Sequence, residues 1–201
     1  MSDYIFLFDL DATITKAEIL PKIAGRINRS QEMAEITEKT MSGEIPFRQS
    51  FLSRVALLKD VPISEAKEIA AAIPLNRQVV EFIRRHKNRC YIATGNLDVW
   101  VEDLLKEIGL EKDRCFCSKA AVARDRVMKV EAVLDKAAVL RQLSKPVVAV
   151  GDGSNDAEMI KLAEIGIGFG GVRPIAPSVL ENAAHAVYDE AALCLLLESL
   201  L

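Results

Sequence analysis

The sequence alternates short apolar runs with segments of helical spacing, and this alternation constrains the fold more than any other feature. Residues 4–8 are aromatic and β-branched, which is typical of a strand buried on both faces. Further apolar runs cover 90–94, 114–117, 146–150, 165–169 and 184–188. Helical patterns cover 77–86, 97–108, 136–143, 154–163 and 190–200. This order predicts an α/β fold with a doubly wound, Rossmann-like parallel sheet.

One long segment interrupts the alternation. From residue 16 to about residue 72, apolar side chains recur at helical spacing, and no strand candidate lies between them. Glycine and proline at 43–46 and proline at 62 indicate where helices end. We therefore expect a helical-bundle cap, residues 16–74, inserted after the first strand. The α/β core would then consist of residues 1–15 and 75–201.

The segment 122–133 has a weaker pattern. Its scattered alternation, with Arg124, Asp125 and Arg126 at a plausible turn, predicts a short hairpin. The four cysteines form no C-x-x-C pair, which favours buried structural thiols. A redox or metal role for Cys115 and Cys117 is the alternative interpretation.

Size and charge exclude several classes of protein. The 201 residues fit one compact domain with a modest insertion. The net charge of -3 gives no general attraction to nucleic acid or to an anionic membrane. The longest apolar run, 191–197, is far shorter than the roughly 20 residues that span a bilayer. We expect a cytoplasmic protein that binds neither nucleic acid nor a membrane, and the oligomeric state stays open.

Polar residues follow three of the predicted strands. They are Asp9 and Asp11 after the first, Thr94, Gly95 and Asn96 at the end of the second, and Asp152, Asn155 and Asp156 after the strand at 146–150. In an open parallel sheet, ligands bind outside the carboxyl ends of the strands. Four carboxylates at one edge repel each other, and a hard divalent cation with oxygen ligands relieves that repulsion. Mg²⁺ fits this demand, and Mg²⁺ in turn suits a phosphate ester.

With these motifs in order, the chain resembles the haloacid dehalogenase superfamily of phosphohydrolases. Asp9 and Asp11 match its Asp-x-Asp-x-Thr motif, and Thr94 matches the hydroxyl of the second motif. Lys136 matches the lysine of the third motif, although Lys119 and Lys129 compete for that role. Asp152 and Asp156 match the Gly-Asp-Gly-x-Asn-Asp motif.

The predicted cap resembles that of the phosphoserine phosphatase group. Glu18 stands where the group has an acid that receives the substrate amino group, and Arg54 stands where it has a carboxylate-binding arginine. Met41, Ser42 and Gly43, followed by Phe47, also resemble its cap segment. Two residues near the reacting centre depart from the group: Ala12 replaces a serine, and Asn96 replaces a glycine.

The resemblance implies a mechanism and a role for each matching residue. Asp9 is expected to attack phosphorus and form an aspartyl-phosphate, and Asp11 to act first as general acid and then as general base. Mg²⁺ is expected to bind Asp9, Asp152 and the backbone carbonyl of Asp11, with Asp156 orienting the metal shell. The remaining implied ligands contact the substrate: Thr94, Gly95, Lys136 and Asn155 at the phosphoryl group, and Glu18 and Arg54 at the amino-acid end.

The resemblance therefore predicts a magnesium-dependent phosphomonoesterase that hydrolyses O-phosphoserine, a small-molecule substrate. One alternative keeps the chemistry and changes the substrate, or transfers the phosphoryl group to another alcohol. Another is a regulator that binds a phosphorylated metabolite without turning it over. The intact pair of Asp9 and Asp11 argues against the regulator.

Overall fold

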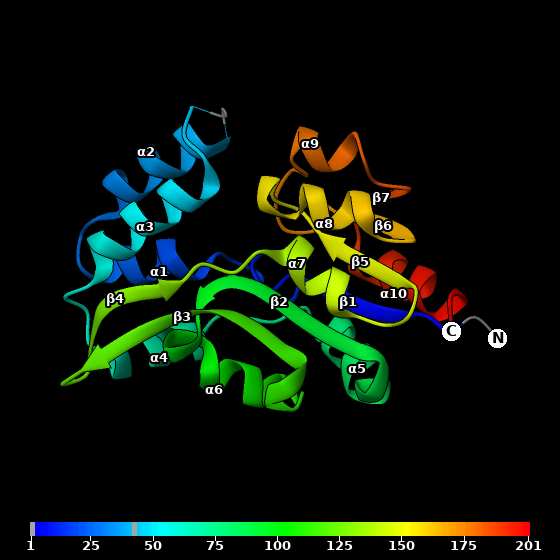
Figure 1. Ribbon diagram of the computed structural model, residues 1–201, viewed down its shortest axis with the longest axis horizontal. Helices are drawn as coiled ribbons and strands as arrows, with labels where there is room; N and C mark the ends of the chain where they lie inside the picture. Colours follow the sequence, from blue (N-terminus) through cyan, green and yellow to red (C-terminus); the bar gives the residue numbers. More distant parts are fainter. Residues whose placement is uncertain (1–2, 42–43) are drawn as a thin grey trace.

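The computed structural model describes residues 3–41 and 44–201, and a single sheet forms the centre of this part of the chain (Figure 1). The strands of the sheet lie in the order β4-β3-β2-β1-β5-β6-β7. Their bounds are β1 Ile5–Phe8, β2 Cys90–Leu97, β3 Cys115–Ala123, β4 Arg126–Ala132, β5 Val147–Gly151, β6 Ile165–Phe169 and β7 His185–Val187. Neighbouring strands are parallel except β3 and β4, which are antiparallel. The predicted α/β fold with a doubly wound sheet is confirmed.

Strand β1 lies at the point where the strand order reverses. All of its residues are buried, and it pairs with β2 on one side and β5 on the other. The pairing with β5 continues past the strand end, where the Asp9 amide donates to the Val150 carbonyl at 2.9 Å. The carboxyl ends of β1, β2 and β5 therefore adjoin, which is where ligands bind in this class of sheet.

Helices cover both faces of the sheet. In Figure 1, α5, α6 and α10 lie on one face, and α7, α8 and α9 lie on the other. The bounds of these helices are α5 Arg77–Arg85, α6 Asp98–Ile108, α7 Lys136–Gln142, α8 Ala157–Leu162, α9 Pro177–Leu180 and α10 Glu190–Ser199. Short 3₁₀ turns are η1 Lys87–Arg89, η2 Lys112–Arg114 and η3 Ser154–Asp156. Among the described residues, no helix is both long and apolar enough to cross a membrane.

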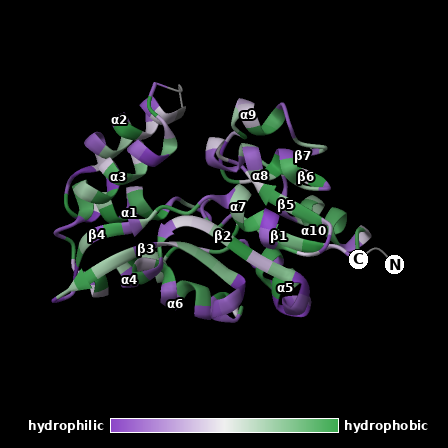
Figure 2. Cartoon of the chain, in the orientation of Figure 1, coloured by the Kyte–Doolittle hydropathy of each residue, from purple (hydrophilic) through white to green (hydrophobic). Residues whose placement is uncertain are grey.

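Four helices lie between β1 and β2 in the chain, where the sequence predicts a helical segment. They are α1 Ile19–Arg26, α2 Ser30–Met41, α3 Phe47–Leu58 and α4 Ile63–Ala71. Hydrophilic and hydrophobic residues mix along α2 and α3, as Figure 2 shows. The two ends of the segment meet, because the Lys16 amide donates to the Pro74 carbonyl at 2.7 Å. The domain boundary at 16–74 stays a prediction, and the motif residues Ser42 and Gly43 lie outside the described residues.

Helix α4 lies against the core rather than away from it. It packs on α6, where Lys67 forms an ion pair with Glu102 at 2.9 Å. The tip of the β3–β4 hairpin also reaches it: the Asp125 carboxylate accepts hydrogen bonds from the Ser64 amide at 3.0 Å and the Ser64 hydroxyl at 2.6 Å. One end of the helical segment is therefore held by the core.

The structure differs from the sequence prediction in three elements. Strand β2 continues to Leu97, with a shift in its register to β3 between Thr94 and Leu97. Strand β3 is longer than predicted because its first half pairs with β2 and its second half pairs with β4. The sequence does not predict the helix α9, because its four residues are too few to show an apolar periodicity. The predicted turn is present, and Arg124 and Asp125 have positive φ angles there.

The packing behind β1 generates a stability prediction. Phe82 of α5 is fully buried, and its ring meets the Phe6 ring edge-on with centroids 5.1 Å apart. We expect Phe82→Ala to lower the free energy of unfolding by about 3–5 kcal/mol, because it leaves a cavity against the strand that carries Asp9. Leu195→Ala, at a leucine that is 72% exposed, is the control and should change it by less than about 0.5 kcal/mol. Equal effects of the two substitutions in urea unfolding would contradict this packing.

Candidate active site

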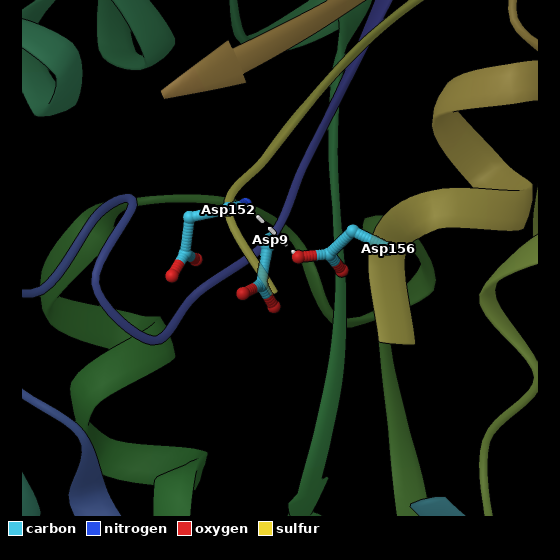
Figure 3. Close-up of side chains that lie close together, drawn as sticks. All are labelled: Asp9, Asp152 and Asp156. Atoms are coloured by element: carbon cyan, nitrogen blue, oxygen red, sulfur yellow. Dashed lines mark hydrogen bonds between the residues drawn. The ribbon is translucent and has the colours of Figure 1, made fainter. Parts of the chain in front are cut away.

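Three aspartates lie together at the carboxyl ends of the central strands. Asp9 follows β1, Asp152 follows β5, and Asp156 lies in η3, just before α8. One carboxylate oxygen from each lies within 4.8 Å of the others, and all three residues are buried. Figure 3 shows the three side chains side by side, with the carboxylate of Asp156 pointing toward Asp9.

A glycine allows the close approach of Asp156. A Cβ atom at Gly151 would lie 2.6 Å from the Asp156 Cγ, so any other residue would displace this carboxylate. The Asp156 Oδ2 accepts hydrogen bonds from the amides of Asp152 at 3.1 Å and Gly153 at 2.9 Å. The loop after β5 therefore folds around Asp156 and holds its Oδ2, while its Oδ1 faces Lys136.

Lys136 supplies a positive charge to this cluster. It begins α7 directly after Asp135, whose carboxylate caps the helix by accepting from the Ala138 amide at 3.1 Å. Its Nζ lies 2.5 Å from both Asp9 Oδ1 and Asp156 Oδ1. The competing lysines lie elsewhere: Lys119 pairs with Asp98, and Lys129 is exposed on β4.

The electrostatics of the cluster are dominated by burial and by repulsion between carboxylates. Burial raises the pKa of Asp9, and the charge of Asp156 raises it further, while Lys136 opposes both effects. Burial, Asp156 and Asp9 likewise raise the pKa of Asp152. Burial lowers the pKa of Lys136, but the charges of Asp156 and Asp9 outweigh it and raise the pKa overall. Lys136 and the Arg173 guanidinium, which pairs with Asp152, bring two positive charges to three carboxylates, so a cation with oxygen ligands would stabilise the remaining negative charge.

Asp11 lies in the turn that follows Asp9. The two residues line one pocket between the sheet and the helical segment. The Asp11 Oδ1 accepts a hydrogen bond from the Ile19 amide at 3.0 Å, where α1 begins. Its Oδ2 accepts from the Asn96 side chain at 2.6 Å. Burial raises the pKa of Asp11, while hydrogen bonds from Asn96 and Ile19 lower it and so limit the increase. A carboxyl group with these opposing influences can hold a proton and also release it.

Thr94 and Gly95 lie at the end of β2 beside this turn. Both residues belong to the strand, which continues to Leu97, and α6 begins at Asp98. The Thr94 hydroxyl is buried, and Gly95 lines the pocket. A Cβ atom at Gly95 would lie 2.9 Å from the Phe47 ring of α3, so the helical segment closes directly onto this backbone.

The helical segment brings a buried arginine to the same pocket. Arg54 of α3 is 8% exposed, and its Nε makes no hydrogen bond within the described residues. Its guanidinium carbon lies 5.9 Å from the centre of the Phe47 ring. Burial lowers the pKa of Arg54, and the negative charge of Asp11 raises it. A buried cation with a free donor is suited to an anionic group of a ligand.

Arg173 is a member of the site that sequence reasoning missed. It lies in the loop between β6 and α9, and it donates hydrogen bonds to the carboxylates of Asp152 and Glu18. It thereby links the loop after β5 to the residue that precedes α1. The signal that could have indicated it is its place after β6, because that strand ends at the same edge of the sheet as β1 and β5.

The predicted site residues divide into two groups around one pocket. Those that line it directly are Asp9, Asp11, Glu18, Arg54, Gly95 and Asn155, together with Arg173. Those that lie buried behind it are Thr94, Lys136, Asp152 and Asp156. The structure therefore brings every predicted site residue to one place. A buried carboxylate, a second carboxyl group and buried positive charge around one pocket are groups that can carry out phosphoryl transfer.

Comparison with known proteins places the chain in a family. Residues 6–161 match the haloacid dehalogenase-like hydrolases. The phosphoserine phosphatase of Methanocaldococcus jannaschii is 32% identical over 180 residues, which cover 82% of this chain and 84% of that protein. The phosphoserine phosphatase of Archaeoglobus fulgidus is 30% identical over 195 residues, but the chain spans only 55% of its length.

Solved structures agree with the sequence comparison. A phospho-aspartyl intermediate analogue of phosphoserine phosphatase has a TM-score of 0.83 and 28% identity, with all of both chains covered. A substrate-bound phosphoserine phosphatase complex has the same TM-score of 0.83 and 27% identity, covering 98% of this chain and 99% of that one. With the family match extending over most of the core and all of the helical segment, this chain belongs to the haloacid dehalogenase-like hydrolases.

Proposed function

We propose that this protein is a magnesium-dependent phosphomonoesterase that hydrolyses O-phosphoserine through an aspartyl-phosphate on Asp9. The observation that carries the proposal is the Arg54 Nε, which has no partner within residues 3–41 and 44–201 and lies in the pocket that Asp9 and Asp11 also line. One pocket therefore contains both the groups for phosphoryl transfer and a cation that can bind a substrate carboxylate. The similar phosphoserine phosphatases support the choice of substrate.

The donor set fits a divalent metal ion. Asp9, Asp152 and Asp156 present hard oxygen atoms within 4.8 Å of one another, and burial, together with their mutual repulsion, raises the pKa of both Asp9 and Asp152. We propose that Asp9, Asp152 and the Asp11 carbonyl hold Mg²⁺, with Asp156 orienting the metal shell. When bound, Mg²⁺ would neutralise negative charge on the phosphoryl oxygens.

Asp9 is the nucleophile in this proposal, and Lys136 determines which oxygen attacks. The Lys136 ammonium holds Asp9 Oδ1, which leaves Oδ2 free of that contact. Oδ2 forms a bond to phosphorus as the bond from phosphorus to the serine oxygen breaks. The transition state is loose, so the position of Asp9 and the neutralisation of charge supply most of the acceleration.

Asp11 moves the protons. In the first step its carboxyl group gives a proton to the serine oxygen as that oxygen leaves. In the second step its carboxylate takes a proton from the water that attacks phosphorus, which releases phosphate and restores Asp9. Thr94, Gly95 and Asn155 hold the phosphoryl oxygens with hydroxyl and amide groups during both steps.

The amino-acid end of the substrate lies toward the helical segment. Arg54 binds the carboxylate, and Glu18 receives the ammonium group. Glu18 also pairs with Arg173, so substrate binding exchanges part of an existing ion pair for a new one. Phe47 closes the pocket above Gly95 and excludes water from the reacting atoms.

The role of Arg54 gives a prediction about specificity. We expect Arg54→Met to lower kcat/KM for L-phosphoserine by about 10- to 100-fold, because a charge-assisted hydrogen bond to the carboxylate is lost. Phosphoethanolamine lacks that carboxylate, so its kcat/KM should stay within about threefold of the wild-type value. Phosphate release measured with both esters checks this difference.

A matched arginine in the same helical segment serves as the control. Arg26 of α1 is exposed and pairs with Glu65 at 2.8 Å, away from the pocket. Arg26→Met should leave both substrates unaffected. If Arg54→Met lowered the two rates by the same factor, the site would not select an amino acid, and another phosphate ester would be the substrate.

The metal site gives a prediction that does not depend on activity. We expect Mg²⁺ to raise the midpoint of thermal unfolding of the wild-type protein, since an ion that binds only the folded state stabilises it. Asp152→Asn removes a ligand and should abolish this increase. Glu158→Gln, at a nearby carboxylate on α8 that is exposed, should retain it. An increase of the same size in Asp152→Asn would show that the metal binds elsewhere.

A further inference from the structure

The Asn96 side chain lies between Asp11 and Thr94, and both have roles in the proposed reaction. It is 1% exposed, lies near the end of β2 and lines the same pocket as Asp9 and Asp11. Its Nδ2 lies 2.6 Å from Asp11 Oδ2 and 3.0 Å from Thr94 Oγ1. The two hydrogens of one amide group therefore connect the proton-transfer residue with the phosphate-binding hydroxyl.

The contacts at Thr94 determine the direction of its proton. Its Oγ1 accepts from the Asn96 side chain and also from the Asn96 amide at 3.2 Å. A hydroxyl oxygen has two acceptor positions, so both are occupied by Asn96. The hydroxyl hydrogen is then left to donate, and the phosphoryl group is the acceptor that the pocket would supply.

The contacts at Asp11 determine the plane of its carboxyl group. Oδ1 receives the Ile19 amide at 3.0 Å, and Oδ2 receives Asn96. The carboxyl group is thus held from both sides, by the start of α1 and by the end of β2. Without Asn96, only the contact to Ile19 would remain, and the group could turn about its side-chain bonds.

The hydrogen bonds of the Asn96 side chain are incomplete. Its Oδ1 is buried and has no hydrogen-bond partner among the described residues, so the side chain carries an uncompensated polar atom. A buried acceptor of this kind disfavours folding. The contacts that the residue does make are those to Asp11 and Thr94.

We propose that Asn96 is a positioning residue that holds Asp11 and Thr94 in the relative orientation required for protonation of the leaving alcohol. The inference rests on the proposed function. In the step concerned, the Asp9 oxygen bonds to phosphorus, the bond to the ester oxygen breaks, and the Asp11 proton moves to that oxygen. An alkoxide needs this proton to leave, whereas a nitrophenolate leaves without it.

The test compares two esters that differ in their need for the proton. We expect Asn96→Ala to lower kcat/KM for L-phosphoserine at least about tenfold more than kcat/KM for 4-nitrophenyl phosphate, since general acid catalysis contributes about 10²- to 10⁴-fold. Asn96→Ser should behave in the same way, because its short side chain cannot reach both partners. Thermal unfolding of each variant verifies that it is folded.

Combination with Asp11→Asn separates positioning from a structural effect. If Asn96 acts through Asp11, adding Asn96→Ala to Asp11→Asn should lower phosphoserine turnover little further. Thr94→Val is the contrasting control, and it should lower the rates for both esters by similar factors.

The outcomes distinguish the inference from the function on which it rests. Equal losses for the two esters, with additive effects in the double variant, would overturn the positioning role while leaving the phosphatase intact. Wild-type protein that hydrolysed neither ester in the presence of Mg²⁺ would overturn the proposed function and this inference together.

Discussion

The contact of one buried lysine with two of three buried aspartates is the interaction on which the rest of the site depends. Lys136 Nζ lies 2.5 Å from Asp9 and from Asp156, at the carboxyl ends of strands that are adjacent only because the sheet is doubly wound. Burying negative charge without a partner raises the free energy of the folded protein. For the same reason, each buried positive charge that pairs with the cluster stabilises it strongly. The same excess of negative charge would repel an anionic phosphoryl group, so phosphate binding would depend on the cation that the cluster holds.

In the proposed function, the helical segment selects the substrate. Helix α4 is held by α6 and by Asp125 of the hairpin, whereas α3 carries Phe47 and Arg54 to the pocket. Arg54 is buried, and its Nε has no partner in the part of the chain that the structure describes, an arrangement that is unfavourable in the protein alone and favourable with an anionic ligand. The link from Glu18 through Arg173 to Asp152 joins the entrance of the helical segment to the loop that follows β5.

Sequence reasoning identified most of the fold and of the candidate site, for physical reasons that differ between residues. Buried strands such as Ile5–Phe8 have continuous apolar runs, and the aspartates that follow them stand out against that background. Arg173 was missed because a single charged residue in a loop resembles any solvated residue until the loop is folded. The extent of β2 was missed because Thr94, Gly95 and Asn96 have a turn-like composition, while pairing with β3 keeps the chain extended beyond a shift in register. Asn96 was recognised as a departure from the phosphoserine phosphatase group, but its hydrogen bonds to Asp11 and Thr94 required the structure.

In the proposed mechanism Asp9 carries the phosphoryl group during turnover, so the decisive experiment is to trap that intermediate. The protein would be mixed with Mg²⁺ and L-phosphoserine, quenched in acid within one turnover, and digested for mass spectrometry. We expect a peptide containing Asp9 that is heavier by one phosphoryl group, and we expect no such peptide from Asp9→Asn. A phosphoryl group on any other residue, or phosphoserine turnover that persists in Asp9→Asn, would mean that Asp9 is not the nucleophile.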